Sequence, residues 1–298
     1  MQRAFRAYLR LRFKFLLPAK YLPKAIAVGY NIRMAEEGKK RRALIGVAIA
    51  AYIVCLGLVI FEMAGGEALF GGEPPAAFTL GMSASERLLL AAAFACLAGV
   101  AGYGRLFVPH IKGGIIAFVA AMALALANFP FFTLASGELT YTAGVGLTAL
   151  YLVNCVAIGL FEESAFRGLL LPLLFGLMKG KRYAGLLATA AQSAVFALFH
   201  IFNLFAGAGF GATMMQVGYT FLMGCLFGAL TLLTRSVVLG MIAHAVYDVG
   251  GTMVTYGVAS GANWDTPSIV IMAVVSSLAG LYLFIAVFRR TWRDSFEL

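Results

Sequence analysis

The sequence predicts an all-α integral membrane protein, a polytopic bundle of eight transmembrane helices. Of its 298 residues, 62% are hydrophobic and only 12% are charged, whereas about a quarter of the residues in a soluble domain are charged. Apolar runs of about 20 residues, the length that a helix needs to cross a bilayer, recur along the chain after residue 43. The basic residues collect between these runs. Together these features argue against a soluble globular fold.

Eight apolar segments are candidate spans, and they lie near residues 44–61, 87–106, 114–134, 143–178, 185–205, 213–234, 236–257 and 267–288. The fourth segment is too long for one span. Pro172 predicts a bend within it, because proline removes a backbone hydrogen bond and clashes with the preceding turn. The part after Pro172 is then expected along the inner surface. The connection 65–85, which contains Pro74 and Pro75, is expected to be the longest outer loop.

The distribution of Lys and Arg predicts which side of the membrane each loop faces. With the N-terminus inside, cytoplasmic stretches hold 21 of the 23 basic residues, the outer loops hold only Arg87, and Arg167 lies within a span. Cytoplasmic loops carry such an excess of positive charge. Eight spans place both termini in the cytoplasm, and we predict a multi-pass protein of the inner (plasma) membrane. The scatter of the basic loops also argues against nucleic acid as a partner.

Three regions follow from this arrangement. Residues 1–43 form a basic amphipathic segment, residues 44–288 form the eight-helix transmembrane domain with a catalytic core at 143–257, and residues 289–298 form a cytoplasmic tail. The first segment interleaves basic with aromatic and aliphatic side chains, which predicts a helix that binds anionic lipids at the membrane surface. It is too long and too basic for the start of a cleaved signal peptide. A solvated tail without lipid contact is the alternative.

The fourth apolar segment contains three charged side chains, Glu162, Glu163 and Arg167. A charge at the centre of a bilayer costs about 2.5–3.5 kcal/mol on insertion scales, so it is kept where it is paired, lines a hydrated cavity or does chemistry. Glu163 and Arg167 are four residues apart and can pair on one helix face. Glu162 then points about 100° away. Its carboxylate would therefore stay available as a base.

Two of the three histidines also lie within predicted spans, His200 in the fifth and His244 in the seventh. Phe196 lies four residues before His200, and Asp248 lies four residues after His244, so each pair shares a helix face. Asp248 could accept a hydrogen bond from one nitrogen of His244, which fixes its tautomer and leaves the other nitrogen for a substrate or metal. Nearly every ionisable group of the membrane interior thus falls into three short motifs, which predicts a single site.

The depths of these motifs agree only in part. With a rise of about 1.5 Å per residue, Glu162 lies about 15 Å and His244 about 13.5 Å above the expected inner boundary. His200 lies eighteen residues beyond Arg182, which is too deep unless the fifth span begins nearer Gln192. We nevertheless expect Glu162, His200 and His244 to face a shared hydrated hollow that is reachable from the inner leaflet.

The motifs Glu-Glu-x-x-x-Arg, Phe-x-x-x-His and His-x-x-x-Asn/Asp, in this order on successive helices, resemble the CPBP (Abi) family of intramembrane endopeptidases. This family includes the CAAX prenyl endopeptidases. The similarity covers residues from about 143 to 257, and Phe-Arg-Gly at 166–168 also resembles the family pattern. The resemblance implies an endopeptidase in which Glu162 is the general base that activates water and His200 assists it.

The resemblance also implies roles for the remaining motif residues. His244 and the Asx position would steady the oxyanion, and Glu163 with Arg167 would hold the first motif in place. Asp248 departs from the Asn often found in the family. Because a charged aspartate is a poor donor to an oxyanion, Asp248 is expected to orient His244 or to be protonated.

We therefore predict a glutamate-type intramembrane endopeptidase without a cofactor, acting on a membrane-anchored or lipid-modified protein or peptide. A zinc-dependent protease is one alternative, because Glu162, His200, His244 and Asp248 are a plausible set of zinc ligands. A second is a non-enzymatic scaffold, immunity or transport protein, although we find no paired repeats of the kind common in transporters. A third is that the charges only fix helix packing. A covalent nucleophile is disfavoured because no Ser, Thr or Cys shares a motif with either histidine.

Overall fold

A computed structural model describes residues 39, 43–55, 57–58, 75–111, 114–178 and 180–293 of the chain. The chain divides into two compact units, residues 1–50 and 51–298. In the first unit residues 43–50 are helical, and the predicted basic segment 1–43 lies almost entirely outside the described residues. The second unit contains every predicted site residue.

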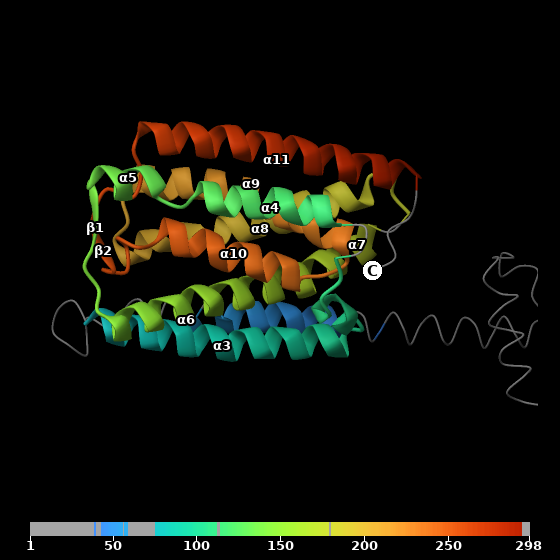
Figure 1. The fold of residues 1–298 in the computed structure, drawn as a ribbon. Coiled ribbons are helices and arrows are strands. Elements are labelled where there is room, and N and C mark those ends of the chain that lie inside the picture. Colours follow the sequence, from blue (N-terminus) through green and yellow to red (C-terminus); the bar gives the residue numbers. More distant parts are fainter. Residues whose placement is uncertain are drawn as a thin grey trace, which may run out of the picture. The chain divides into compact units, whose positions relative to one another are not determined.

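Helices form nearly all of the described part of the second unit (Figure 1). The first half of the order is α3 (Ala76–Val100), η2 (Gly104–Phe107), α4 (Ile115–Ala127), α5 (Phe131–Ser136), β1 (Leu139–Tyr141), α6 (Val145–Glu162) and η3 (Glu163–Leu170). The second half is α7 (Leu171–Met178), α8 (Ala184–Phe199), η4 (His200–Ala206), α9 (Phe210–Thr234), α10 (Val238–Gly251), β2 (Ala259–Gly261) and α11 (Thr266–Arg293).

The lengths and composition of these helices confirm an all-α, multi-pass membrane protein. Among the described residues, six helices are long and apolar enough to cross a bilayer: Ala76–Val100, Ile115–Ser136, Val145–Met178, Ala184–Leu204, Phe210–Thr234 and Thr266–Arg289. Two shorter apolar helices, Ala43–Cys55 and Val238–Gly251, lie at the positions of the first and seventh predicted spans. Each predicted span therefore coincides with an apolar helix, and eight complete crossings stay a prediction.

The second span begins earlier than the sequence suggested. The residues from Ala76 to Ser85, which we expected in an outer loop, form the first turns of α3. Proline is favoured at helix starts, where its missing N–H has no partner to lose, and Pro75 caps this helix. Arg87, assigned to an outer loop, lies instead within α3, where its Nη1 is 3.3 Å from Glu86 Oε2. Because the two charges are adjacent and paired, they do not end the helix.

The predicted bend at Pro172 is displaced toward the N-terminus. Pro172 lies inside α7, and the helical geometry changes instead over Glu163–Leu170, which form a π-helix. Helix α7 continues past Pro172 to Met178, and the inner boundary near Pro172 stays a prediction. In a span packed on both sides, neighbouring helices can satisfy the backbone groups that proline frees.

Small residues bring α8 and α9 close together. A Cβ atom on Gly224 would lie 2.8 Å from Ser193 Cβ, and one on Gly228 would lie 2.9 Å from Thr189 Cγ2. The Gln192 side chain uses this short separation, because its Nε2 donates to the Gly224 carbonyl oxygen at 2.9 Å. Small residues and interhelical hydrogen bonds are the usual means by which helices associate in membranes. This contact between α8 and α9 fixes the helix that leads to His200.

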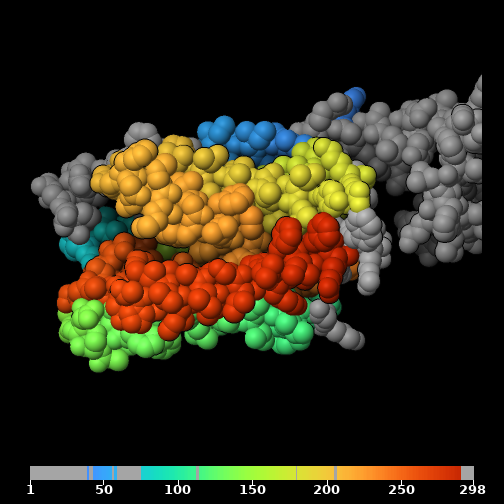
Figure 2. Space-filling model, turned by 90° about the horizontal axis from the view of Figure 1, so that it is seen from above, coloured from blue at the N-terminus to red at the C-terminus, as the bar shows by residue number. Residues whose placement is uncertain are grey.

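Helices α9 and α11 lie side by side on the face shown in Figure 2, with α4 along the other edge of α11. The outward side of α11 is apolar, as expected for contact with lipid tails. Several of its side chains are more than half exposed: Ile269, Val270, Val274, Leu278, Leu281 and Phe284. At one end of the unit, β1 and β2 form an antiparallel pair that joins Leu139 to Gly261 and Tyr141 to Ala259.

Candidate active site

The first motif lies where one long helix changes its geometry. Helix α6 ends at Glu162, and the π-helix η3 follows without a break. In a π-helix each amide bonds to the carbonyl five residues earlier instead of four, and such segments are rare and frequent at functional sites. All residues from Glu163 to Leu169 are buried. The charged motif is therefore presented by an irregular, enclosed turn rather than by a regular lipid-facing helix.

Glu163 and Arg167 form the predicted ion pair in this turn. Arg167 Nη1 lies 2.9 Å from Glu163 Oε1, and both side chains are 0% exposed. The guanidinium carbon also lies 4.5 Å from the centre of the Phe196 ring and 5.8 Å from that of Phe227, which adds a cation–π attraction. Within the described chain the guanidinium makes no well-aligned hydrogen bond. The carboxylate and the two aromatic faces therefore compensate this buried charge.

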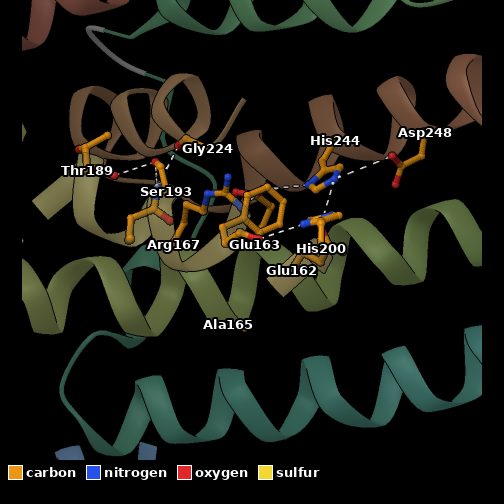
Figure 3. A network of polar contacts seen from close by, with 12 residues as sticks. Glu162, Glu163, Ala165, Arg167, Thr189, Ser193, His200, Gly224, His244 and Asp248 are labelled. Atoms are coloured by element: carbon orange, nitrogen blue, oxygen red, sulfur yellow. Dashed lines mark hydrogen bonds and ion pairs between the residues drawn. The ribbon is translucent and has the colours of Figure 1, made fainter. Parts of the chain in front are cut away.

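His244 joins the first motif to α10. Its Nδ1 lies 2.9 Å from Glu163 Oε1, while its Nε2 lies 3.4 Å from Glu162 Oε2 and 3.9 Å from Asp248 Oδ1. Figure 3 shows the imidazole between these carboxylates, with its ring pointing toward the π-helix. Because an ionised carboxylate can only accept, Nδ1 carries the proton in the Glu163 contact. The Nε2 atom is left facing Glu162 and Asp248.

The partner that orients His244 is therefore Glu163 and not Asp248. We expected Asp248 to hold one nitrogen of His244, but 3.9 Å is too long for a hydrogen bond. The sequence could not show this contact, because Glu163 and His244 are 81 residues apart. Glu163 Oε1 is shared between Arg167 and His244, which makes it the centre of the network.

The two neighbouring glutamates differ in exposure. The side chain of Glu162 is 19% exposed and that of Glu163 is fully buried. This agrees with the prediction that the helix directs the two carboxylates apart. Of the two glutamates, Glu162 is the one that combines contact with His244 and partial exposure.

His200 is the first residue of η4, directly after α8, and it approaches the same cluster. Its ring contacts Phe196 edge-on at 5.0 Å between centroids, and the His244 ring contacts the same phenylalanine at 6.4 Å. Its Nδ1 lies 2.9 Å from the Phe196 carbonyl oxygen, which can only accept. Nδ1 therefore carries the proton, and Nε2 is the acceptor nitrogen. Phe196 thus contacts Arg167, His200 and His244 together, a role that its place in the Phe-x-x-x-His motif did not reveal.

Helix α8, which leads to His200, begins at Ala184. The expected start of the membrane span nearer Gln192, with the first turns in the interface, stays a prediction. The π-helix of 8 residues and α7 of 8 residues separate Glu162 from the connection to α8, and the 16 residues of α8 separate that connection from His200. Glu162 and His200 therefore lie equally far along two consecutive helices.

Two glycines permit the close approach of α6 and α10. A Cβ atom on Gly159 would lie 3.0 Å from the Met241 carbonyl oxygen, and one on Gly240 would lie 2.8 Å from Glu163 Oε2. A side chain at Gly159 would press against the backbone of α10, and one at Gly240 would displace the Glu163 carboxylate. Sequence reasoning missed both residues, because a glycine inside an apolar span gives no sign of what it faces.

The proposed zinc ligands do not gather into a metal site. Among the described residues, no three or more His, Cys, Asp or Glu side chains are placed so that they could hold a metal ion. Glu162, His244 and Asp248 are close together, but His200 contacts the cluster through Phe196. The donor arrangement gives no support to the zinc-dependent alternative.

Comparison with known proteins identifies the segment that contains these residues. Residues 144–250 match the family described as type II CAAX prenyl endopeptidase Rce1-like. All six predicted site residues, Glu162, Glu163, Arg167, His200, His244 and Asp248, fall within the match. The family resemblance inferred from the three motifs is confirmed over this segment. No curated protein and no solved structure matches the chain.

Proposed function

We propose that this chain is a glutamate-dependent intramembrane endopeptidase. The observation that carries the proposal is the position of His244 between two glutamates, of which one is sealed against Arg167 and the other reaches the surroundings. The match to a family of CAAX-type proteases over 144–250 supports the same class of reaction. Glu162 is then the base, and Glu163 with Arg167 holds the imidazole that faces it.

Hydrolysis on this geometry begins with a water molecule beside Glu162. The carboxylate takes a proton from water as its oxygen attacks the carbonyl carbon of the peptide bond, and it returns that proton to the amide nitrogen as the C–N bond breaks. Both products leave with complete valences, and no covalent enzyme intermediate forms. The partial exposure of Glu162 is suited to this step, which needs access for both water and substrate.

The two histidines have different parts in this scheme. His200 donates a hydrogen bond through Nδ1 to the Phe196 carbonyl oxygen, so its Nε2 can accept a hydrogen bond from the attacking water and orient it while Glu162 takes the proton. His244 donates through Nδ1 to Glu163, and in its doubly protonated form Nε2 can donate to the oxyanion. Donors aimed at such an oxyanion are worth about 2.7–4 kcal/mol in soluble proteases. Asp248 would help to hold His244 in that form.

The proposed membrane setting is eight spans with both termini in the cytoplasm of the inner (plasma) membrane. The Leu106 carbonyl oxygen accepts from the Val237 amide, which supports placing the connections that follow α3 and α9 on the same side. The basic residues Arg105 and Arg235 lie in these two connections. We propose a membrane-anchored or lipid-modified protein as substrate, anionic lipids as partners of the basic N-terminus, and no nucleic acid and no cofactor.

The test compares membrane proteins from cells that produce the wild-type chain, Glu162→Gln or Glu138→Gln. Glu138 is an exposed carboxylate beside β1 and serves as the matched control. The expected result is that one or more membrane proteins accumulate uncut with Glu162→Gln and are cut with the other two chains. Cleavage that persists with Glu162→Gln would contradict the assignment of the base.

The purified chain then separates the remaining alternatives. Cleavage of the identified substrate in proteoliposomes is expected to continue in a chelator. Loss of cleavage in chelator that is restored by Zn²⁺ would establish the metal-dependent alternative. Full biological function in a Glu162→Ala strain would instead indicate a scaffold or transport role.

A further inference from the structure

We propose that Tyr52, outside the family segment, is a positioning residue that holds the π-helix of the active site in place. This inference rests on the proposed function and extends it to a helix that none of the three motifs includes. Tyr52 lies in the apolar helix Ala43–Cys55. Its hydroxyl donates a hydrogen bond to the carbonyl oxygen of Ala165. Ala165 is the third residue of the π-helix and is fully buried.

The acceptor has a special place in the chain. Ala165 lies two residues after Glu163 and two residues before Arg167, in the middle of the turn that presents the ion pair. A side-chain hydroxyl that bonds to a helix carbonyl competes with the regular amide ladder and is a recognised cause of local departures from α-helical geometry. The Tyr52 hydroxyl therefore favours the five-residue bonding pattern at the place where the motif needs it.

Aromatic packing holds the tyrosine in position. The Tyr52 ring lies 4.9 Å from Phe94 of α3 and 5.8 Å from Phe166 of the π-helix. Phe166 in turn lies 4.9 Å from Phe196, which is the ring beneath the Arg167 guanidinium. A continuous series of rings thus connects Tyr52 to the buried ion pair. Ring pairs at these separations attract each other beyond the effect of their burial.

The hydroxyl and the ring can be separated by substitution. Tyr52→Phe keeps the ring contacts and removes only the hydrogen bond to Ala165. Tyr103→Phe is the matched control, because the Tyr103 hydroxyl also reaches a carbonyl of the same long helix, that of Pro172 at 3.5 Å, but beyond the π-helix. Both substitutions remove one oxygen atom and leave an aromatic ring.

The first measurement is hydrogen–deuterium exchange of the full chain in lipid nanodiscs. Loss of a hydrogen bond worth about 1 kcal/mol should raise exchange in peptides covering 163–170 about fivefold in Tyr52→Phe. Exchange in peptides from 213–234 should stay as in the wild type and in Tyr103→Phe, and the melting temperature should fall by only about 2–4 °C. Equal exchange in the two tyrosine variants, or faster exchange in every helix of Tyr52→Phe, would overturn the proposal.

The second measurement is the kinetics of cleavage. A displacement of about 1 Å at a catalytic group can cost a hundredfold in rate, and we expect kcat to fall about tenfold in Tyr52→Phe with KM within about twofold of the wild type. Unchanged kcat despite faster exchange would overturn the positioning role. The outcome is separable from that of the proposed function: if Glu162→Gln cleaves as well as the wild type, the assignment of Glu162 as the base fails, while the exchange data still decide whether Tyr52 holds the π-helix.

Discussion

Glu162 and Glu163 are adjacent in the sequence and chemically identical, yet the fold gives them different surroundings. Glu163 is fully buried, lies 2.9 Å from both Arg167 Nη1 and His244 Nδ1, and has no exposure to the surroundings. Glu162 is 19% exposed and lies 3.4 Å from His244 Nε2. The same imidazole therefore contacts one carboxylate on each side.

This difference teaches that the role of an acidic residue in a membrane is set by what surrounds it. Two neighbouring carboxylates can serve as acid–base group and as fixed support when their environments differ. Glu163 contacts the Arg167 guanidinium and the His244 imidazole and is fully buried, so it can stay charged and immobile. Glu162 contacts an imidazole and is partly exposed, which suits a group that exchanges protons.

The largest expected effect is on catalysis by the exposed glutamate. Glu162→Gln should lower kcat by about 10²–10⁴, the usual contribution of a positioned general base, with little change in melting temperature because its carboxylate is not sealed in. The measurement is single-turnover cleavage together with thermal unfolding in the same lipid. A variant that unfolds much more easily than the wild type would contradict the contrast between the two glutamates.

The burial of the Glu163 charge can be tested by removing Arg167, the cation that pairs with it. Arg167→Leu leaves Glu163 buried without its counter-ion, and breaking a buried pair on one side typically costs about 3–5 kcal/mol. The free energy of unfolding in mixed micelles measures this loss. Adding Glu163→Gln to Arg167→Leu should restore part of it, because the uncompensated charge is gone. Arg182→Leu, at an exposed arginine, is the control, and an equal loss there would contradict the prediction.

The crossing of α6 and α10 gives an intermediate effect. Gly240→Ala places a Cβ atom 2.8 Å from Glu163 Oε2, and such overpacking typically costs about 1–3 kcal/mol. Because the added atom meets the carboxylate that orients His244, kcat should fall as well. Gly218→Ala in α9 is the control, since a Cβ atom there meets nothing within 4 Å. Equal stability and activity of the two variants would argue against close packing at Gly240.

The smallest expected effect is on stability, when Asp265 before α11 is replaced. Asp265 Oδ1 accepts from the Ser268 amide at 2.8 Å at the start of α11, and the Ser268 hydroxyl and amide lower the pKa of Asp265 below its usual 3.8. A lowered pKa gives stability that is present above the unfolded-state value and is lost as the pH falls through the folded-state value. Asp265→Asn should therefore lower the melting temperature slightly at pH 7, with the difference shrinking below about pH 3.8. A difference that grew in acid would contradict this assignment.

The parts of the site that could be predicted from the sequence are those within one helix. The pairing of Glu163 with Arg167 and the divergence of Glu162 follow from helical spacing, and the six motif residues follow from the cost of charges in a membrane. The contact from Glu163 to His244 depends on how two distant helices cross, which no local spacing contains. The start of α3 was missed because Glu86 and Arg87 lower the hydropathy of a stretch whose charges are paired.

The remaining errors have the same origin. Pro172 was read as a bend from its own chemistry, whereas tertiary contacts place the irregular turn nine residues earlier, beginning at Glu163. Tyr52 carried no signal, since one tyrosine in an apolar span is unremarkable until its hydroxyl is seen on the Ala165 carbonyl oxygen.

The small β-ladder constrains how such a site can admit a peptide. Strand β1 leads into α6 and β2 follows α10, and the Val258 carbonyl oxygen also accepts from the amides of Thr142 and Ala143 at 3.0 and 3.1 Å. The β-ladder therefore joins α6 and α10, the helices that carry Glu162 and His244, at one end, and the two helices are in close contact at Gly159. We therefore expect Glu162 and His244 to keep their spacing when a peptide enters the site, and any movement that admits the peptide to involve the other helices.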